Sequence, residues 1–459
     1  MENNRTQIAG DYDALIIGGG FKGMMSAYGL TKQGLKVCIV DNAPLLGGFM
    51  APLTWQGVDM DKGPQYLDGV NGAQKAILDD IMSDHQPLDS LEFSYASYWN
   101  GVITKGFAIP DYRTLDKSQK AQILYEAITD TAATITNSGD QTPQCIGDSF
   151  NEQNEVSASY ISKWCHKFLN ASPFELSPIN QNFVTFFGRK LVLDNDLSLD
   201  LKQHPLLDDA IAANKKQINH NTYNLYPKGK TLGYFRQAFE HKLGVMGVES
   251  KLKSQVTKVL TKAQANDEGY TIMLDVAGQA EQVTARAVYC AGTIESSESL
   301  LLSSDTLKAK VQGVSQVFYL IELDSELDLP FYIMNYSDDS LSRVTYFNAY
   351  GQKSINGKAI ICVEVPAKIG SEIWTTPDKH YPTLVNELAR MGISGCGAYQ
   401  AVPIPSTYRL ALKGYEQAYQ HLLAQVEQQY GQGVHILTPH LLTRASIMQD
   451  LSDAGILTS

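Results

Sequence analysis

The chain has 459 residues, a hydrophobic content of 44% and a formal net charge of −12. This length accommodates two or three domains, each with a core of its own. The acidic balance argues against nucleic acid and anionic membrane surfaces as partners, because both require a basic face on the protein. No run of about 18 consecutive apolar residues occurs, so we expect no membrane-spanning segment.

The six cysteines are scattered along the chain and form no CxxC pair, which indicates reduced and mostly buried thiols. The polar N-terminal residues 1–13 lack the apolar core of a signal peptide. We therefore expect a cytoplasmic protein. The spacing of potential ligands predicts no metal site.

The N-terminal region contains the most informative pattern. The apolar run 12–17 predicts a strand, a glycine turn follows at 18–20, and the apolar residues after the turn recur at helical spacing. A second apolar strand at 36–40 ends on Asp41. Strand, glycine turn, helix, strand and acid in this order are typical of a dinucleotide-binding βαβ unit.

Each motif residue has a physical role in such a unit. Gly18 permits the tight turn, Gly20 lets the backbone approach a pyrophosphate, and Gly23 lets the helix pack closely on the strand. The helix that starts near Phe21 presents free N–H groups to the phosphates. Asp41 can accept hydrogen bonds from ribose hydroxyls, and no basic residue directly follows it to favour a 2′-phosphate.

Two further glycine-containing segments follow, Gly47-Gly48-Phe49 and Asp61-Lys62-Gly63-Pro64-Gln65-Tyr66. They resemble motifs of the flavoprotein group that includes monoamine and polyamine oxidases, protoporphyrinogen oxidase, phytoene desaturase and UDP-galactopyranose mutase. The resemblance implies FAD as the cofactor, with the first segment near its phosphates and ribityl chain and the second against the isoalloxazine. The contacts that it implies are Gly47, Gly48, Phe49, Gly63, Pro64, Gln65 and Tyr66.

The resemblance extends to later parts of the chain. Residues 226–232 are similar to the motif at which the family's chain re-enters the FAD domain. Val256 matches a strand valine that meets the adenine end of FAD, and an apolar strand ends on Ala291 and Gly292. Near the C-terminus the family's glycine is missing, so Thr443 or Arg444 is expected to supply a phosphate contact.

The middle of the chain differs in character and is rich in aromatic residues. The W…P…L pattern at 164–176 is similar to the cap region of UDP-galactopyranose mutase, where a basic residue follows. Arg189 falls at about that place. We predict that Arg189, Tyr346 and Arg409 bind the substrate.

These observations predict an α/β fold with two domains. A discontinuous, Rossmann-type FAD-binding domain comprises residues 1–85, 222–300 and 400–459. A substrate-binding domain of the α+β type, with a mixed or antiparallel sheet, comprises residues 86–221 and 301–399.

Three functions remain open. The first is an FAD-dependent oxidoreductase of the amine-oxidase or protoporphyrinogen-oxidase type, which transfers a hydride from a small organic substrate to the flavin. The second is a UDP-galactopyranose mutase-like enzyme acting on a nucleotide sugar. The Trp164 region, Arg189 and Arg409 favour the mutase, since a nucleotide diphosphate requires arginines. The third is a non-catalytic flavin-binding or scaffold protein. The sequence identifies no catalytic residue.

Overall fold

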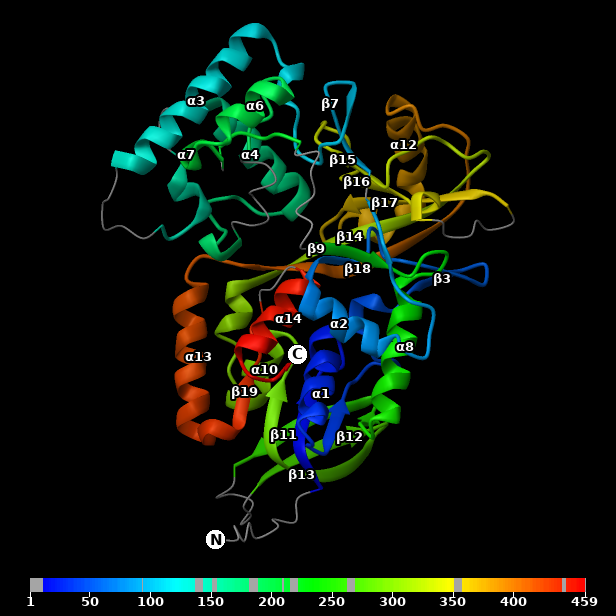
Figure 1. Ribbon diagram of the computed structural model, residues 1–459, viewed down its shortest axis with the longest axis vertical. Helices are drawn as coiled ribbons and strands as arrows, with labels where there is room; N and C mark the ends of the chain where they lie inside the picture. Colours follow the sequence, from blue (N-terminus) through cyan, green and yellow to red (C-terminus); the bar gives the residue numbers. More distant parts are fainter. Residues whose placement is uncertain are drawn as a thin grey trace.

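The computed structural model describes most of the chain and contains two β-sheets with helices around them (Figure 1). The described residues are 11–92, 94–136, 143–150, 155–180, 189–208, 210–214, 222–261, 269–350, 357–439 and 443–458. Within these ranges, no helix is both long enough and apolar enough to cross a membrane.

The first sheet has a parallel core with an antiparallel extension. Its strand order is β10-β2-β1-β13-β12-β11, and β19 also pairs with β13. Neighbours from β10 to β13 run parallel, as do β13 and β19, whereas β11, β12 and β13 are antiparallel. The strands are β1 (Tyr12–Ile17), β2 (Val37–Val40), β10 (Glu249–Lys251), β11 (Ser254–Leu260), β12 (Tyr270–Val276), β13 (Gln279–Cys290) and β19 (Val434–Ile436).

Helices from several parts of the chain surround this sheet, as Figure 1 shows. They are α1 (Phe21–Lys32), α2 (Gly72–Ile81), α8 (Leu232–Val245), α10 (Ile294–Leu302), α13 (Tyr415–Tyr430) and α14 (Arg444–Asp453). The C-terminal segment packs tightly on α1, because a Cβ at Gly29 would lie 2.2 Å from the carbonyl oxygen of Ile456. The Rossmann-type arrangement predicted from the glycine motif is therefore confirmed.

The second sheet is mostly antiparallel, with the order β18-β14-β17-β16-β15-β7-β8. Only β15 and β7 run parallel among its pairs of described strands. The strands are β7 (Tyr95–Trp99), β8 (Val102–Lys105), β14 (Val311–Leu323), β15 (Tyr332–Asn335), β16 (Arg343–Tyr346), β17 (Ala359–Pro366) and β18 (Cys396–Ala411). This mixed sheet agrees with the predicted α+β character of the second part.

Strand β14 joins the two parts of the molecule. Because side chains alternate between the faces of a strand, Phe318 and Leu320 enter the core that also contains α1 and α8. Val317, Tyr319 and Ile321 enter a second core with α12 (Pro377–Arg390) on the opposite face. One face of the second sheet is thus packed toward the first part, which places the floor of a cavity between the two.

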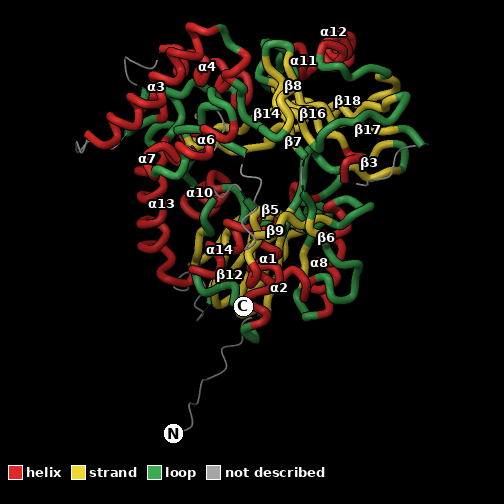
Figure 2. Tube along the Cα trace, turned by 45° about the horizontal axis from the view of Figure 1, so that its top comes forward, coloured by secondary structure: helices red, strands yellow, loops and turns green. Residues whose placement is uncertain are grey.

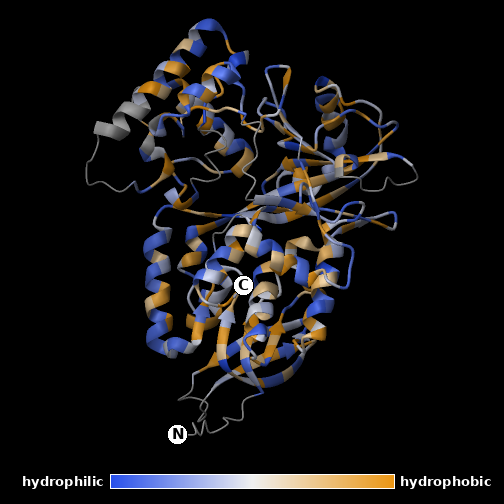
Figure 3. Cartoon of the chain, in the orientation of Figure 1, coloured by the Kyte–Doolittle hydropathy of each residue, from blue (hydrophilic) through white to orange (hydrophobic). Residues whose placement is uncertain are grey.

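A helical group lies to one side of the second sheet in both Figure 1 and Figure 2. It contains α3 (Lys117–Thr136), α4 (Glu155–Trp164), α6 (Asn195–Leu201) and α7 (Pro205–Asp208). Trp164 and Phe168, part of an aromatic stripe in the sequence, are buried in its core. The alternation of hydrophobic and hydrophilic residues along α13 is visible in Figure 3 and fits a helix with one buried face.

The remaining strands form small sheets between these parts. Strands β3 (Leu53–Trp55) and β4 (Val58–Met60) make a hairpin. Strand β9 (Thr222–Tyr226) pairs with β5 (Leu67–Asn71) and β6 (Asp89–Ser90). Short helices are η1 (Gly48–Met50), the π-helix η4 (Cys165–Leu169), η5 (Pro178–Asn180) and α11 (Glu372–Thr375).

The predicted domain boundary at residue 400 lies inside a strand. β18 pairs with β14 over most of its length, so residues 400–411 extend the second sheet. Pro403 and Pro405 make this strand hard to recognise in the sequence. Prolines are tolerated here because β18 is the edge strand of its sheet.

Candidate functional site

Three neighbouring cavities form a track along the N-terminal end of α1. The first, about 700 Å³, is called the Asp41 cavity and is lined by Ile17, Asp41, residues 254–257 and part of α10. The second, about 350 Å³, is the Lys22 cavity, which contacts Gly20, Lys22 and Thr438. The third, about 430 Å³, is the Arg444 cavity between the two sheets.

Shared lining residues connect these cavities in series. Gly18, Asp41, Gly292 and Thr293 line both the Asp41 and the Lys22 cavities. Arg409, Pro439 and Ile447 line both the Lys22 and the Arg444 cavities. The three cavities are therefore contiguous, from the end of β2 past the start of α1 to the space between the two large sheets.

The Asp41 cavity lies at the carboxyl ends of β1 and β2, where parallel α/β sheets bind their ligands. The Asp41 carboxylate accepts hydrogen bonds from the backbone N–H groups of Gly19 at 2.5 Å and Ala43 at 2.7 Å. These contacts fix the acid at the wall of both cavities that it lines. Val256 and Gly292 line the same cavity.

The three motif glycines have different surroundings. A Cβ at Gly23 would lie 1.9 Å from the Gly18 carbonyl oxygen, so glycine is required for the packing of α1 on β1. Gly18 has a φ of +104°, and a Cβ there would lie 2.9 Å from the Gly292 nitrogen. At Gly20, in contrast, a Cβ would meet no atom within 4 Å. Gly20 thus faces open space beside the N-terminus of α1, whose cap has no side-chain hydrogen bond.

Lys22 adds a positive charge to this region. Its Nζ donates to the carbonyl oxygens of Thr438 at 2.6 Å and Leu437 at 3.4 Å, and the residue lines the Lys22 cavity. Burial lowers the pKa of its ammonium to about 8, although the negative charge of Asp450 acts in the opposite direction.

The second glycine pair packs against the first motif. The Gly47 N–H donates to the Gly19 carbonyl oxygen at 2.7 Å. Gly47 has a φ of +103°, and a Cβ there would lie 2.4 Å from Cγ of the buried Arg236. A Cβ at Gly48 would lie 3.3 Å from Cα of Gly20. The pair therefore holds η1 close to the open space in front of α1.

The floor of the Arg444 cavity carries a buried ion pair from the second sheet. Glu364, which is only 2% exposed, accepts from Arg343 Nε at 2.7 Å and Nη2 at 2.8 Å. Arg343 Nη2 also donates to the Tyr408 hydroxyl at 3.1 Å. Gly63, with a φ of +68°, lies against this pair, since a Cβ there would be 2.5 Å from Glu364 Oε1.

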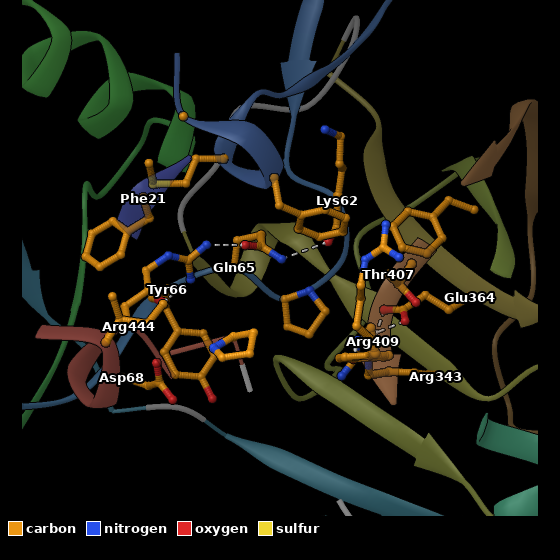
Figure 4. Close-up of a pocket in the computed structure, with 18 of the residues that line it drawn as sticks. Phe21, Lys62, Gln65, Tyr66, Asp68, Arg343, Glu364, Thr407, Arg409 and Arg444 are labelled. Atoms are coloured by element: carbon orange, nitrogen blue, oxygen red, sulfur yellow. Dashed lines mark hydrogen bonds and ion pairs between the residues drawn. The ribbon is translucent and has the colours of Figure 1, made fainter. Parts of the chain in front are cut away.

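Arg444, the first residue of α14, lies at the opposite wall of this cavity (Figure 4). It donates to the Tyr66 carbonyl oxygen at 2.7 Å and to Gln65 Oε1 at 2.6 Å. Burial lowers the pKa of its guanidinium, whereas the charge of Asp68 raises it. Arg444 therefore fixes the 65–66 segment at the wall, and it does not line the Lys22 cavity beside α1.

Only some of the site residues predicted from the sequence line the three cavities. Phe21, Gly47, Phe49, Pro64, Gln65, Tyr66, Arg409 and Arg444 line the Arg444 cavity, and Ala291 lines the Lys22 cavity. Arg189 and Tyr346 line none of the three. Tyr346 is 5% exposed and its hydroxyl accepts from the Leu327 N–H, so it belongs to the core of the second sheet.

Several lining residues were missed by the sequence analysis. Lys22 could have been identified as a candidate from the sequence, because it lies inside the glycine motif. Arg343, Glu364 and Tyr408 carried no such signal. They meet only through the pairing of β16, β17, β14 and β18, which are far apart along the chain.

Comparisons with known proteins agree with this arrangement. Residues 16–81 match the family model of an NAD(P)-binding Rossmann-like domain. No curated protein matches the chain in sequence.

Solved structures share the fold over nearly the whole chain. Reduced UDP-galactopyranose mutase has a TM-score of 0.65 and 13% identity, covering 98% of this chain and 95% of that one. An Exiguobacterium sp. 255-15 protein, provisionally named a protoporphyrinogen oxidase, has a TM-score of 0.64 and 13% identity, covering 96% and 97%. Wild-type putrescine oxidase bound to putrescine has a TM-score of 0.62 and 14% identity, covering 97% and 98%.

At these identities the likeness establishes the fold alone. The chain therefore contains a segment, residues 16–81, that is similar to Rossmann-like domains, and it shares the fold of these solved structures, as its motifs predicted.

Proposed function

We propose that the protein is an FAD-dependent oxidoreductase that oxidises a small organic substrate in the Arg444 cavity. The observation that carries this proposal is the track of three connected cavities beside α1. Three adjoining cavities in series suit an extended dinucleotide better than a compact ligand. The neighbours of similar fold are oxidoreductases and a mutase, which supports an enzyme.

The residues along the track fit FAD. Asp41 is placed to accept from a ribose, and the space in front of Gly20 suits a diphosphate beside the N-terminus of α1. Phe49, Pro64, Gln65 and Tyr66 line the Arg444 cavity, where the ring system would lie. Bound FAD supplies two-electron chemistry, with a hydride taken from the substrate.

The protein's own part is to bind, orient and exclude water. Gln65 is held between Arg444 and the Lys62 carbonyl oxygen, to which its Nε2 donates at 3.2 Å. The Arg343–Glu364 pair is fixed by its two hydrogen bonds, so it presents a rigid polar floor. Tyr408 joins this floor through its hydroxyl.

A second candidate is a mutase-like enzyme acting on a nucleotide sugar. It is favoured by three arginines, Arg343, Arg409 and Arg444, which line one cavity. Arginine is well suited to phosphate recognition. Arg189, which the sequence analysis also assigned to this reading, does not line that cavity.

The two candidates can be separated with FAD-loaded protein under anaerobic conditions. We would mix it with amines, other small reductants and UDP-galactose, and follow the flavin absorbance and the sugar products. Loss of the oxidised flavin spectrum on mixing with an organic substrate supports the oxidoreductase. Conversion of UDP-galactose only after prior reduction of the flavin would replace it with the mutase. A flavin that responds to neither under any condition argues for the non-catalytic alternative.

A further inference from the structure

We propose that Lys22 binds the diphosphate of the cofactor and links it to the C-terminal segment. This inference rests on the proposed function, because it assigns a role to one residue of the same site. Lys22 occupies the position before the third glycine of the motif, and this motif needs only its glycines and the helix N-terminus to bind phosphate. The lysine is therefore additional to what the motif needs.

The position of Lys22 suits a negatively charged ligand. It is the second residue of α1, and it lines the same cavity as Gly18 and Gly20. No atom of the described residues lies within 4 Å of a Cβ at Gly20, and Gly20 and Lys22 line the same cavity of about 350 Å³. A diphosphate in this space would meet backbone N–H groups on one side and an ammonium on the other.

The hydrogen bonds of Lys22 leave it able to bind such a ligand. Its two acceptors are the backbone carbonyl oxygens of Leu437 and Thr438, which carry no formal charge. An ammonium has three N–H donors, so within the described part of the chain one N–H of Lys22 remains for a phosphate oxygen. The nearest acid that affects it, Asp450, accepts a hydrogen bond from Thr438 Oγ1 at 3.0 Å.

Other charged groups around the cavity do not replace Lys22. Arg409 also lines it but forms an ion pair with Glu295. Asp41 contributes a negative charge at the far side. Arg444 is turned to the Arg444 cavity, where it holds Gln65 and the Tyr66 carbonyl. Lys22 is thus the basic residue that connects α1, the diphosphate space and the segment before α14.

Titration of Lys22 gives the proposal a characteristic pH dependence. Its pKa is about 8 in the protein without ligand, mainly because of burial. A bound diphosphate favours the charged form and raises this pKa. FAD affinity should therefore be at its maximum below about pH 8. It should fall as the pH rises from there to the raised pKa of Lys22 in the complex, by at most about tenfold per pH unit. The FAD diphosphate itself is a diester and does not titrate in this range.

The test measures the binding of FAD, ADP and riboflavin to flavin-free protein by calorimetry. Lys22→Met removes the charge at similar length, and Lys22→Arg retains it. The matched control is Lys32→Met, at the other end of α1, where the lysine pairs with Asp80 at the surface. Melting temperatures of the ligand-free variants show whether Lys22→Met disturbs the fold.

We expect Lys22→Met to weaken FAD and ADP by about tenfold or more and to leave riboflavin unchanged. Lys22→Arg should stay within about threefold of the unmodified protein, and neither variant should show the pH-dependent loss. Equal affinities for FAD in Lys22→Met and Lys32→Met would overturn the proposal. So would an equal loss for riboflavin, since that result assigns Lys22 a purely structural role.

The outcome also separates this inference from the proposed function. If the unmodified protein binds ADP through Lys22 but no flavin, the inference stands and the flavoenzyme assignment fails. If it binds FAD with no contribution from Lys22, the assignment stands and the inference fails.

Discussion

Replacing Gly20 by alanine separates cofactor binding from folding, because a Cβ at this glycine points into space that no described atom fills. Its φ of −65° is accessible to alanine, and the new Cβ would meet no protein atom within 4 Å. The stability of the ligand-free variant should therefore stay within about 1 kcal/mol of the unmodified protein, because the lower entropy of its unfolded chain offsets the poorer capping of α1 by alanine.

The same methyl group would occupy the space proposed for the diphosphate. Losing one charge-assisted hydrogen bond from the α1 backbone costs about 1.5–3 kcal/mol. That loss corresponds to a Kd for FAD that is about tenfold to a hundredfold higher. Calorimetric titration with FAD and thermal unfolding without FAD measure the two quantities independently.

Gly23→Ala is the opposite case within the same motif. Its Cβ would lie 1.9 Å from the backbone oxygen of Gly18, so β1 and α1 must separate. Overpacking of this kind costs at least about 1–3 kcal/mol of stability, which lowers the melting temperature by several degrees. Gly244→Ala, in an open position on α8, serves as the control: it should leave FAD affinity unchanged and should not lower the melting temperature, because alanine is the better helix former. Unchanged FAD affinity in Gly20→Ala would refute the placement of the diphosphate.

Three further changes test other parts of the site. Asp41→Asn removes the charge at the wall of the Asp41 cavity. FAD affinity, measured by calorimetry, should fall by about tenfold, because hydrogen bonds to charged groups contribute about 1.5–3 kcal/mol. Unchanged affinity would show that Asp41 does not bind the ribose. Glu364→Gln leaves the Arg343 charge without its partner, so the free energy of unfolding measured in urea should decrease by about 3–5 kcal/mol. A decrease below about 1 kcal/mol would show that the pair is not effectively buried. Gly47→Ala combines a φ of +103° with a contact to Arg236 at 2.4 Å, so its melting temperature should drop clearly below that of Gly244→Ala, and equal values would contradict the tight packing of η1.

The βαβ unit could be predicted from the sequence because its determinants are local. The strand, glycine turn, helix, second strand and acid all lie within residues 12–41, and helix and strand periodicity distinguish them directly. Pro403 and Pro405 had the opposite effect. These prolines made β18 hard to predict. Prolines are tolerated at a sheet edge, and only the three-dimensional structure shows that β18 lies at one.

The floor of the Arg444 cavity could not be predicted in the same way. Arg343, Glu364 and Tyr408 come from three strands whose register decides which side chains meet. A shift of one residue would turn each of them to the other face of the sheet. Tyr346 illustrates the problem, because its position in a strand did not reveal that its hydroxyl faces the Leu327 backbone.

Arg444 was expected near the phosphates because it lies at the start of the last helix. The structure shows its guanidinium over the Phe21 ring at the start of α1 and its hydrogen bonds on Gln65 and the Tyr66 carbonyl, while Lys22 lines the cavity beside Gly20. The sequence shows that the arginine lies near the start of the last helix, but the direction of its side chain depends on the segment that packs against it.

The most direct test of the central claim is the visible absorption spectrum of the purified protein, recorded before and after addition of FAD and again after dithionite. The account predicts a bound flavin whose absorption bands disappear on reduction. A protein that is colourless, takes up no added FAD and shows no change with dithionite would contradict it, even if the Rossmann-like segment still binds another dinucleotide.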